Sequence, residues 1–73
     1  MKYQIKTLGL HCGHCDASVE AALLKVAGVT DADADHETNT VEVECTQDTT
    51  PKSLTAAIEG ASENFAVVSI ETA

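Results

Sequence analysis

The stretch GLHCGHCDASVEAALLKVAGV, residues 9–29, combines a loop rich in cysteine and histidine with a run rich in alanine and leucine. In the second half, apolar residues recur with the i, i+3, i+4, i+7 spacing of one helical face. These residues are Val19, Ala22, Leu23 and Val26. Gly28 follows where a helix C-cap is expected. The stretch therefore predicts a helix of about three turns that begins near Cys15, with a loop ahead of it.

Four strands and a second helix are predicted around this stretch. Apolar and polar residues alternate over residues 2–8, 29–35 and 41–45, and the polar residues 36–39 form a turn between the last two runs. Thr50 and Pro51 are suited to the N-cap and first position of a helix. The apolar stripe of this helix would consist of Leu54, Ala57, Ile58 and Ala61. Residues 65–70 form the last predicted strand.

The predicted order is β-α-β-β-α-β, the ferredoxin-like or split βαβ arrangement of the α+β class. Its four-stranded antiparallel sheet carries two helices on one face. A chain of 73 residues is long enough for one domain with a small core, so residues 1–73 are expected to form a single domain.

The charge of the chain excludes several classes of partner. Twelve acidic residues against four lysines give a net charge of -8, which repels nucleic-acid phosphates and anionic lipids. No apolar run approaches the roughly 18 residues that a membrane span needs, and no leader peptide is visible. We therefore expect a cytoplasmic protein that binds neither nucleic acid nor membrane, with surface carboxylates that favour a basic partner.

Cys12 and Cys15 form a CxxC motif, a spacing that cytosolic proteins use for metal or redox chemistry. Paired thiolates favour soft ions such as Cu(I) and Zn(II). A helix N-terminus also stabilises the thiolate, which is the form that binds metal. The third cysteine, Cys45, continues the inward alternation of its strand and is expected to be a buried apolar residue.

The number of ligands favours copper over zinc. A structural zinc site requires four ligands, whereas the motif supplies two. His14 is a candidate auxiliary ligand and His11 a second one, but residues so close in sequence rarely complete a tetrahedron. A two-coordinate, exposed Cu(I) site that a partner thiolate can enter fits better. His36, in the predicted turn, is expected to be merely solvated.

The tetrapeptide CGHC also occurs in protein disulfide isomerases, which leaves a thiol–disulfide oxidoreductase as an alternative. That fold requires a longer chain and a cis-proline before a strand, whereas Pro51 opens a helix. An aromatic residue also usually precedes its first cysteine, where His11 stands. No other catalytic grouping is visible, so the chain is expected to be a metal-binding protein and not an enzyme.

Residues 9–29 resemble the signature of heavy-metal-associated domains, found in small copper chaperones and at the N-termini of P-type metal ATPases. That signature runs Gly-Met-x-Cys-x-x-Cys, then Val-Glu, Leu and Gly-Val. The matching residues are Gly9, Cys12, Cys15, Val19, Glu20, Leu23, Gly28 and Val29. Leu10 replaces the methionine, which packs under the loop in the family, and Phe65 lies slightly later than the family's aromatic residue near the metal.

The resemblance implies that Cys12 and Cys15 are the metal ligands and that the cargo is Cu(I), with Zn(II) as the alternative. It also implies transfer by thiolate exchange to a copper-transporting P-type ATPase or its metal-binding domain. Because the chain enters its first strand directly after Met1, we expect a free-standing monomeric carrier, with metal-bridged dimers at high concentration.

Overall fold

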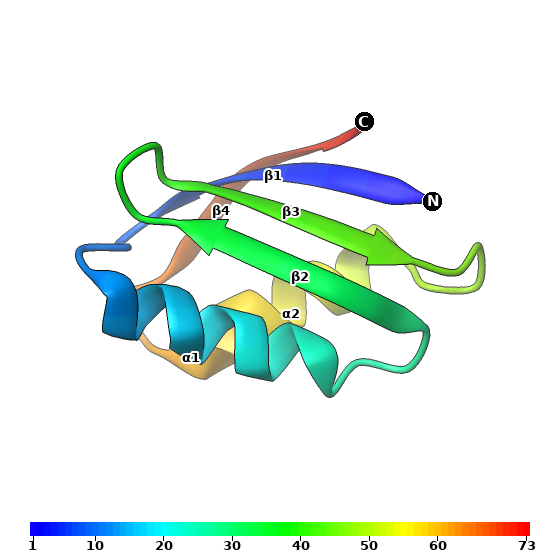
Figure 1. Cartoon of the computed structure of the whole chain (residues 1–73), viewed down its shortest axis with the longest axis horizontal. Helices are drawn as coiled ribbons and strands as arrows, with labels where there is room; N and C mark the ends of the chain where they lie inside the picture. Colours follow the sequence, from blue (N-terminus) through cyan, green and yellow to red (C-terminus); the bar gives the residue numbers. More distant parts are fainter.

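The computed structural model describes residues 1–73 and contains four strands and two helices. These elements are β1 (Lys2–Leu8), α1 (Gly13–Leu24), β2 (Val29–Asp35), β3 (Thr40–Cys45), α2 (Pro51–Ala61) and β4 (Ala66–Thr72). The strands form one antiparallel sheet in the order β2-β3-β1-β4. Both helices cover the same face of the sheet (Figure 1). The predicted ferredoxin-like fold is confirmed, and neither helix has the length and apolar character needed to cross a bilayer.

The core lies between the sheet and the two helices. Its fully buried side chains come from β1, β3, α1 and α2, and they are Ile5, Val41, Val43, Val19, Leu23, Leu54 and Ile58. Each of these positions follows the periodicity seen in the sequence, because alternate strand residues and one helical stripe face the same layer. Cys45 is only 4% exposed, so the prediction that it is a buried apolar residue is confirmed.

The Val19-Glu20 pair attaches α1 to the sheet. The Val19 side chain is fully buried in the core. The Glu20 carboxylate accepts a hydrogen bond from the backbone N–H of Ala34 at 2.9 Å. β2 is an edge strand, so this contact occupies a backbone donor that would otherwise be unpaired.

Helix α1 begins and ends earlier than expected. Cys12 is its N-cap and Lys25 its C-cap, so the prediction that Gly28 is the C-cap is wrong. The chain leaves the helix through short turns, in which the N–H groups of Lys25 and Val26 bond to carbonyls three residues back. Gly28 has a φ of +90° and lies in the connection to β2, where a Cβ would come within 2.3 Å of the Thr49 hydroxyl.

The start of α2 and the position of β4 are close to those expected. Thr50 caps α2, since its hydroxyl accepts the backbone N–H of Ser53 at 3.2 Å, and Pro51 is the first helical residue. β4 begins at Ala66, one residue later than predicted, since the N–H of Phe65 bonds to the Ser62 carbonyl in a turn, and it ends at Thr72, two residues later than predicted.

Three connections meet at one end of the sheet: the loop before α1, the turn between β2 and β3, and the segment between α2 and β4 (Figure 1). The two chain termini lie at the other end. This arrangement brings the cysteine-containing loop close to segments that are distant in sequence.

Candidate metal site

The two cysteines of the CxxC motif lie side by side at the start of α1. Cys12 is exposed and has an extended backbone, with φ −160° and ψ 174°, whereas Cys15 is in the first helical turn and partly buried against the core. Their Sγ atoms are 3.8 Å apart and both thiols are free. One side of the pair therefore faces solvent and the other is supported by the fold.

The helix N-terminus stabilises the Cys12 thiolate. Its sulfur makes no full capping hydrogen bond, but the free N–H groups of Cys15 and His14 lie close to it. These N–H groups, and then the Cys15 thiol, lower the pKa of Cys12 below its usual range. A larger share of Cys12 is therefore in the form that binds a metal at neutral pH.

The loop before the cysteines is packed tightly against the segment between α2 and β4. Gly9 has a φ of +99°, and a Cβ there would lie 2.0 Å from the backbone oxygen of Asn64. Leu10 is 2% exposed and belongs to the core. Leu10 is therefore a packing residue of the core and not an exposed part of the site.

A shallow pocket of about 270 Å³ opens beside Cys15. Its lining includes Phe65 from the end of the α2–β4 segment, together with His11 from the loop before α1 and His14 from the first turn of α1. Phe65 is 7% exposed, so its ring both contributes to the core and borders the site. The aromatic residue thus reaches the site despite its later position in the sequence.

Most of the chain matches a known protein family. The model of the heavy-metal-associated domain matches residues 5–63, which include the CxxC motif and most of both layers of the fold. The chain belongs to the heavy-metal-associated domain family.

Relatives of this heavy-metal-associated domain include proteins named for copper. Copper chaperone CopZ of Staphylococcus aureus strain NCTC 8325 is 47% identical over 36 residues, which cover 49% of this chain and 53% of CopZ. The chain thus spans about half the length of the curated relatives it matches.

Solved structures match over nearly the whole chain. A structure described as CopZ metallochaperone has 32% identity and a TM-score of 0.86, covering 93% of this chain and 100% of that one. A copper binding domain from HMA7, a P-type ATPase, has 30% identity and a TM-score of 0.83, covering 96% of each chain. These matches confirm both the family and the ferredoxin-like fold inferred from the sequence.

Of the candidate metal ligands, only the thiols of Cys12 and Cys15 lie close together. No group of three or more histidine, cysteine or acidic side chains is arranged to hold one metal ion. His11, on the loop before α1, and His14, in the first turn of α1, are exposed and do not form such a group with the thiols. Cys45 donates its backbone N–H to Met1 at the opposite end of the sheet, which places its thiol away from the loop.

His36, near the metal site, lies in a different environment from the one that the sequence predicts. The expectation that His36 is merely solvated is wrong, because its Nδ1 lies 2.7 Å from Oδ2 of Asp16 and its side chain is only 33% exposed. Asp16 raises the pKa of His36 by hydrogen bonding to the charged ring. The available signal was an acidic residue directly after the second cysteine and a histidine in a turn at the same end of the sheet.

Proposed function

We propose that this chain carries Cu(I) on Cys12 and Cys15 and passes it to a partner by thiolate exchange. The observation that supports this most is the pair of sulfur atoms 3.8 Å apart at an exposed helix N-terminus. Two metal–sulfur bonds of about 2.3 Å span at most about 4.6 Å. An ion therefore fits between the sulfurs after an opening of less than about 1 Å.

The ligand set favours Cu(I) over Zn(II). A closed zinc site needs four ligands, whereas no third side chain is grouped with the two thiols. Soft thiolates with few other donors suit Cu(I). Relatives of the chain are named copper chaperone and copper binding domain, which supports the same choice.

Transfer would follow from the openness of the site. A partner thiol loses its proton and forms a third copper–sulfur bond, after which one bond to Cys12 or Cys15 breaks. A second exchange completes the transfer, the released thiolates take up the protons, and copper stays Cu(I) throughout. Cys12 is the better exposed of the two ligands, so we expect its bond to be the first that a partner reaches.

The proposed partner is a copper-transporting P-type ATPase or its metal-binding domain, and the proposed setting is the cytoplasm. The structural likeness to a copper binding domain of a P-type ATPase supports this partner. The net charge of -8 favours a partner with a basic docking face. We propose that residues 1–73 act as one domain, as a carrier without catalytic activity, monomeric when free and able to form metal-bridged dimers.

Anaerobic titration of the reduced chain with Cu(I) and with Zn(II), each against a competing chelator, tests this proposal. We expect one Cu(I) per chain, held more tightly than Zn(II). Cys12→Ser and Cys15→Ser should each weaken Cu(I) binding by more than about 100-fold, since losing a ligand costs more than losing an outer-shell partner. The copper assignment fails if Zn(II) is retained while Cu(I) is stripped.

Two further variants serve as matched controls in the same titration. Cys45→Ala removes a thiol that is buried away from the loop and should leave Cu(I) binding unchanged. His14→Ala tests the auxiliary ligand, and we expect unchanged affinity because the His14 side chain is not grouped with the thiols. If both serine variants bind Cu(I) like the native chain, the site assignment is wrong.

A further inference from the structure

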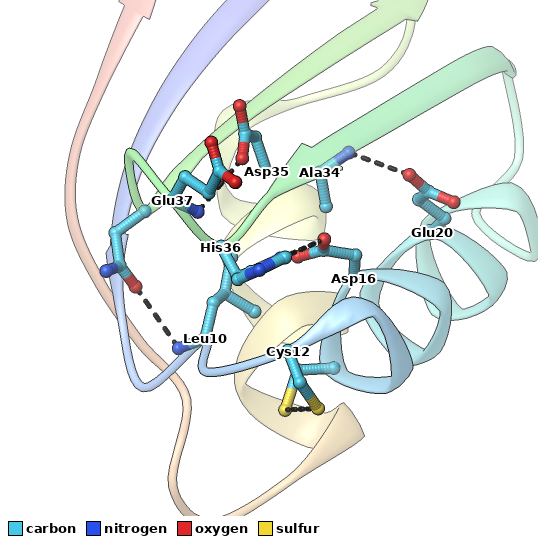
Figure 2. A network of polar contacts seen from close by, with 10 residues as sticks. Leu10, Cys12, Asp16, Glu20, Ala34, Asp35, His36 and Glu37 are labelled. Carbon is cyan, nitrogen blue, oxygen red and sulfur yellow. Dashed lines mark hydrogen bonds and ion pairs between the residues drawn. The ribbon is translucent and has the colours of Figure 1, made fainter.

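The turn between β2 and β3 contacts the segment that carries the two cysteines, here called the metal loop (residues 10–16), on its N-terminal side. The side-chain oxygen of Asn39 accepts the backbone N–H of Leu10 at 3.1 Å. Leu10 lies two positions before Cys12, so this bond fixes the chain just ahead of the first thiol. Figure 2 shows the contact of Leu10 at the edge of the loop.

Asn39 is itself held firmly in place. Its φ of +50° lies in the left-handed region, which asparagine tolerates better than most residues. Its backbone oxygen accepts both the N–H and the hydroxyl of Thr7, at 2.8 and 3.0 Å. Thr7 is 3% exposed, so the turn residue Asn39 is anchored by a buried residue of β1.

The same turn holds the metal loop on its C-terminal side. His36 Nδ1 lies 2.7 Å from Oδ2 of Asp16, the residue directly after Cys15. In Figure 2 the His36 ring points toward the Asp16 carboxylate. The two contacts together enclose residues 10–16, which contain both thiols.

The Asp16 carboxylate makes this contact from a largely buried position. Its side chain is 16% exposed, and its other oxygen, Oδ1, is buried without a hydrogen-bond partner. A buried acceptor without a partner lowers stability. His36 is therefore the one hydrogen-bond partner of the Asp16 side chain, and its removal would leave both carboxylate oxygens without a partner from the protein.

We propose that Asn39 and His36 are positioning residues of the metal site, which hold residues 10–16 from both sides and keep the two thiols arranged for an incoming metal ion. This inference rests on the proposed function. It assigns no new ligand. Without the two contacts the loop would populate conformations in which the sulfur atoms are apart, and the apparent Kd for Cu(I) rises as the competent fraction falls.

Variants of Asn39 separate its side-chain bond from its backbone conformation. Asn39→Gly keeps the left-handed conformation but removes the acceptor for Leu10, whereas Asn39→Asp keeps an acceptor oxygen. Similarly, His36→Ala removes the partner of Asp16, while His36→Asn retains an amide N–H at about the place of Nδ1. Thr38→Ala, in the same turn with an exposed side chain, is the matched control.

Two measurements are made on the metal-free and Cu(I)-loaded chain, well below its melting temperature: the Kd for Cu(I) from chelator competition, and the hydrogen-exchange rate of the Leu10 amide. We expect Asn39→Gly and His36→Ala each to raise the Kd by about three- to tenfold, the effect of losing one hydrogen bond. Asn39→Gly should also speed exchange of the Leu10 amide in the metal-free chain, because this amide loses its acceptor.

The conservative variants and the control distinguish a positioning role of Asn39 and His36 from a role in stability alone. Asn39→Asp, His36→Asn and Thr38→Ala should stay within about twofold of the native Kd. The proposal is overturned if Asn39→Gly and His36→Ala lower the melting temperature but keep the native Kd, since the contacts would then serve stability alone. It is also overturned if Asn39→Asp binds as weakly as Asn39→Gly. Unchanged binding in Cys12→Ser and Cys15→Ser would instead refute the proposed function.

Discussion

Replacing Gly9 by alanine should destabilise the fold strongly and disturb the metal loop. The φ of +99° is a conformation that an L-residue adopts only at a cost of order 1–3 kcal/mol. The new Cβ would also lie 2.0 Å from the backbone oxygen of Asn64, so the segment between α2 and β4 has to move. We expect a loss of about 3 kcal/mol or more, a large part of the stability of a small domain.

Urea denaturation followed by circular dichroism measures this loss. For a domain of this size 1 kcal/mol corresponds to about 4–8 °C, so the melting temperature should fall by at least about 12 °C. Cu(I) binding should weaken as well, because Gly9 begins the loop that carries Cys12.

Gly60→Ala is the matched control for Gly9→Ala. A Cβ at Gly60 has no neighbour within 4 Å and the residue is helical. Alanine there should stabilise the chain by roughly 0.5 kcal/mol. If Gly9→Ala changes the unfolding free energy by less than about 0.5 kcal/mol, a change typical of neutral surface sites, the close approach of Gly9 and Asn64 does not exist in solution.

Three further predictions concern titration and the sheet edge. Because the pKa of Cys12 is lowered, its rate of labelling by iodoacetamide, followed by mass spectrometry, should reach half-maximum below the pH typical of a free thiol, and a half-maximum at or above that pH would refute this. The pKa of His36 is raised in the folded state, so its bond to Asp16 adds stability that is complete below about pH 6.5 and declines as pH rises through the folded pKa. The difference in unfolding free energy between the native chain and His36→Ala, measured by urea titration, should therefore shrink between about pH 6 and pH 8. Glu20→Ala leaves the N–H of an edge strand without its acceptor and should cost about 1 kcal/mol, and an unchanged urea midpoint would argue against that bond.

Features with short-range causes could be predicted from the sequence. Alternation over β1 placed Ile5 in the core, and the stripe through Val19 and Leu23 placed α1 over the sheet, because each signal depends on neighbours within one element. Thr50 as a cap likewise follows from its own hydroxyl and the next turn of chain. The CxxC motif is similarly local, since three residues bring Cys12 and Cys15 together.

Features that depend on distant segments could not be predicted. The pairing of His36 with Asp16 joins residues 20 positions apart, and it exists only because the turn and the metal loop share one end of the sheet. The end of α1 differs from the prediction for a similar reason. The chain turns at Lys25 to reach β2, and Gly28 packs against Thr49, which lies in the segment between β3 and α2.

X-ray absorption at the copper edge, recorded anaerobically on the Cu(I)-loaded chain, tests whether Cys12 and Cys15 bind the metal ion. We expect a first shell of sulfur alone, with the two sulfurs contributed by Cys12 and Cys15 in the absence of added thiol. A shell containing imidazole nitrogen, or a spectrum unchanged when both cysteines are replaced by serine, would contradict it.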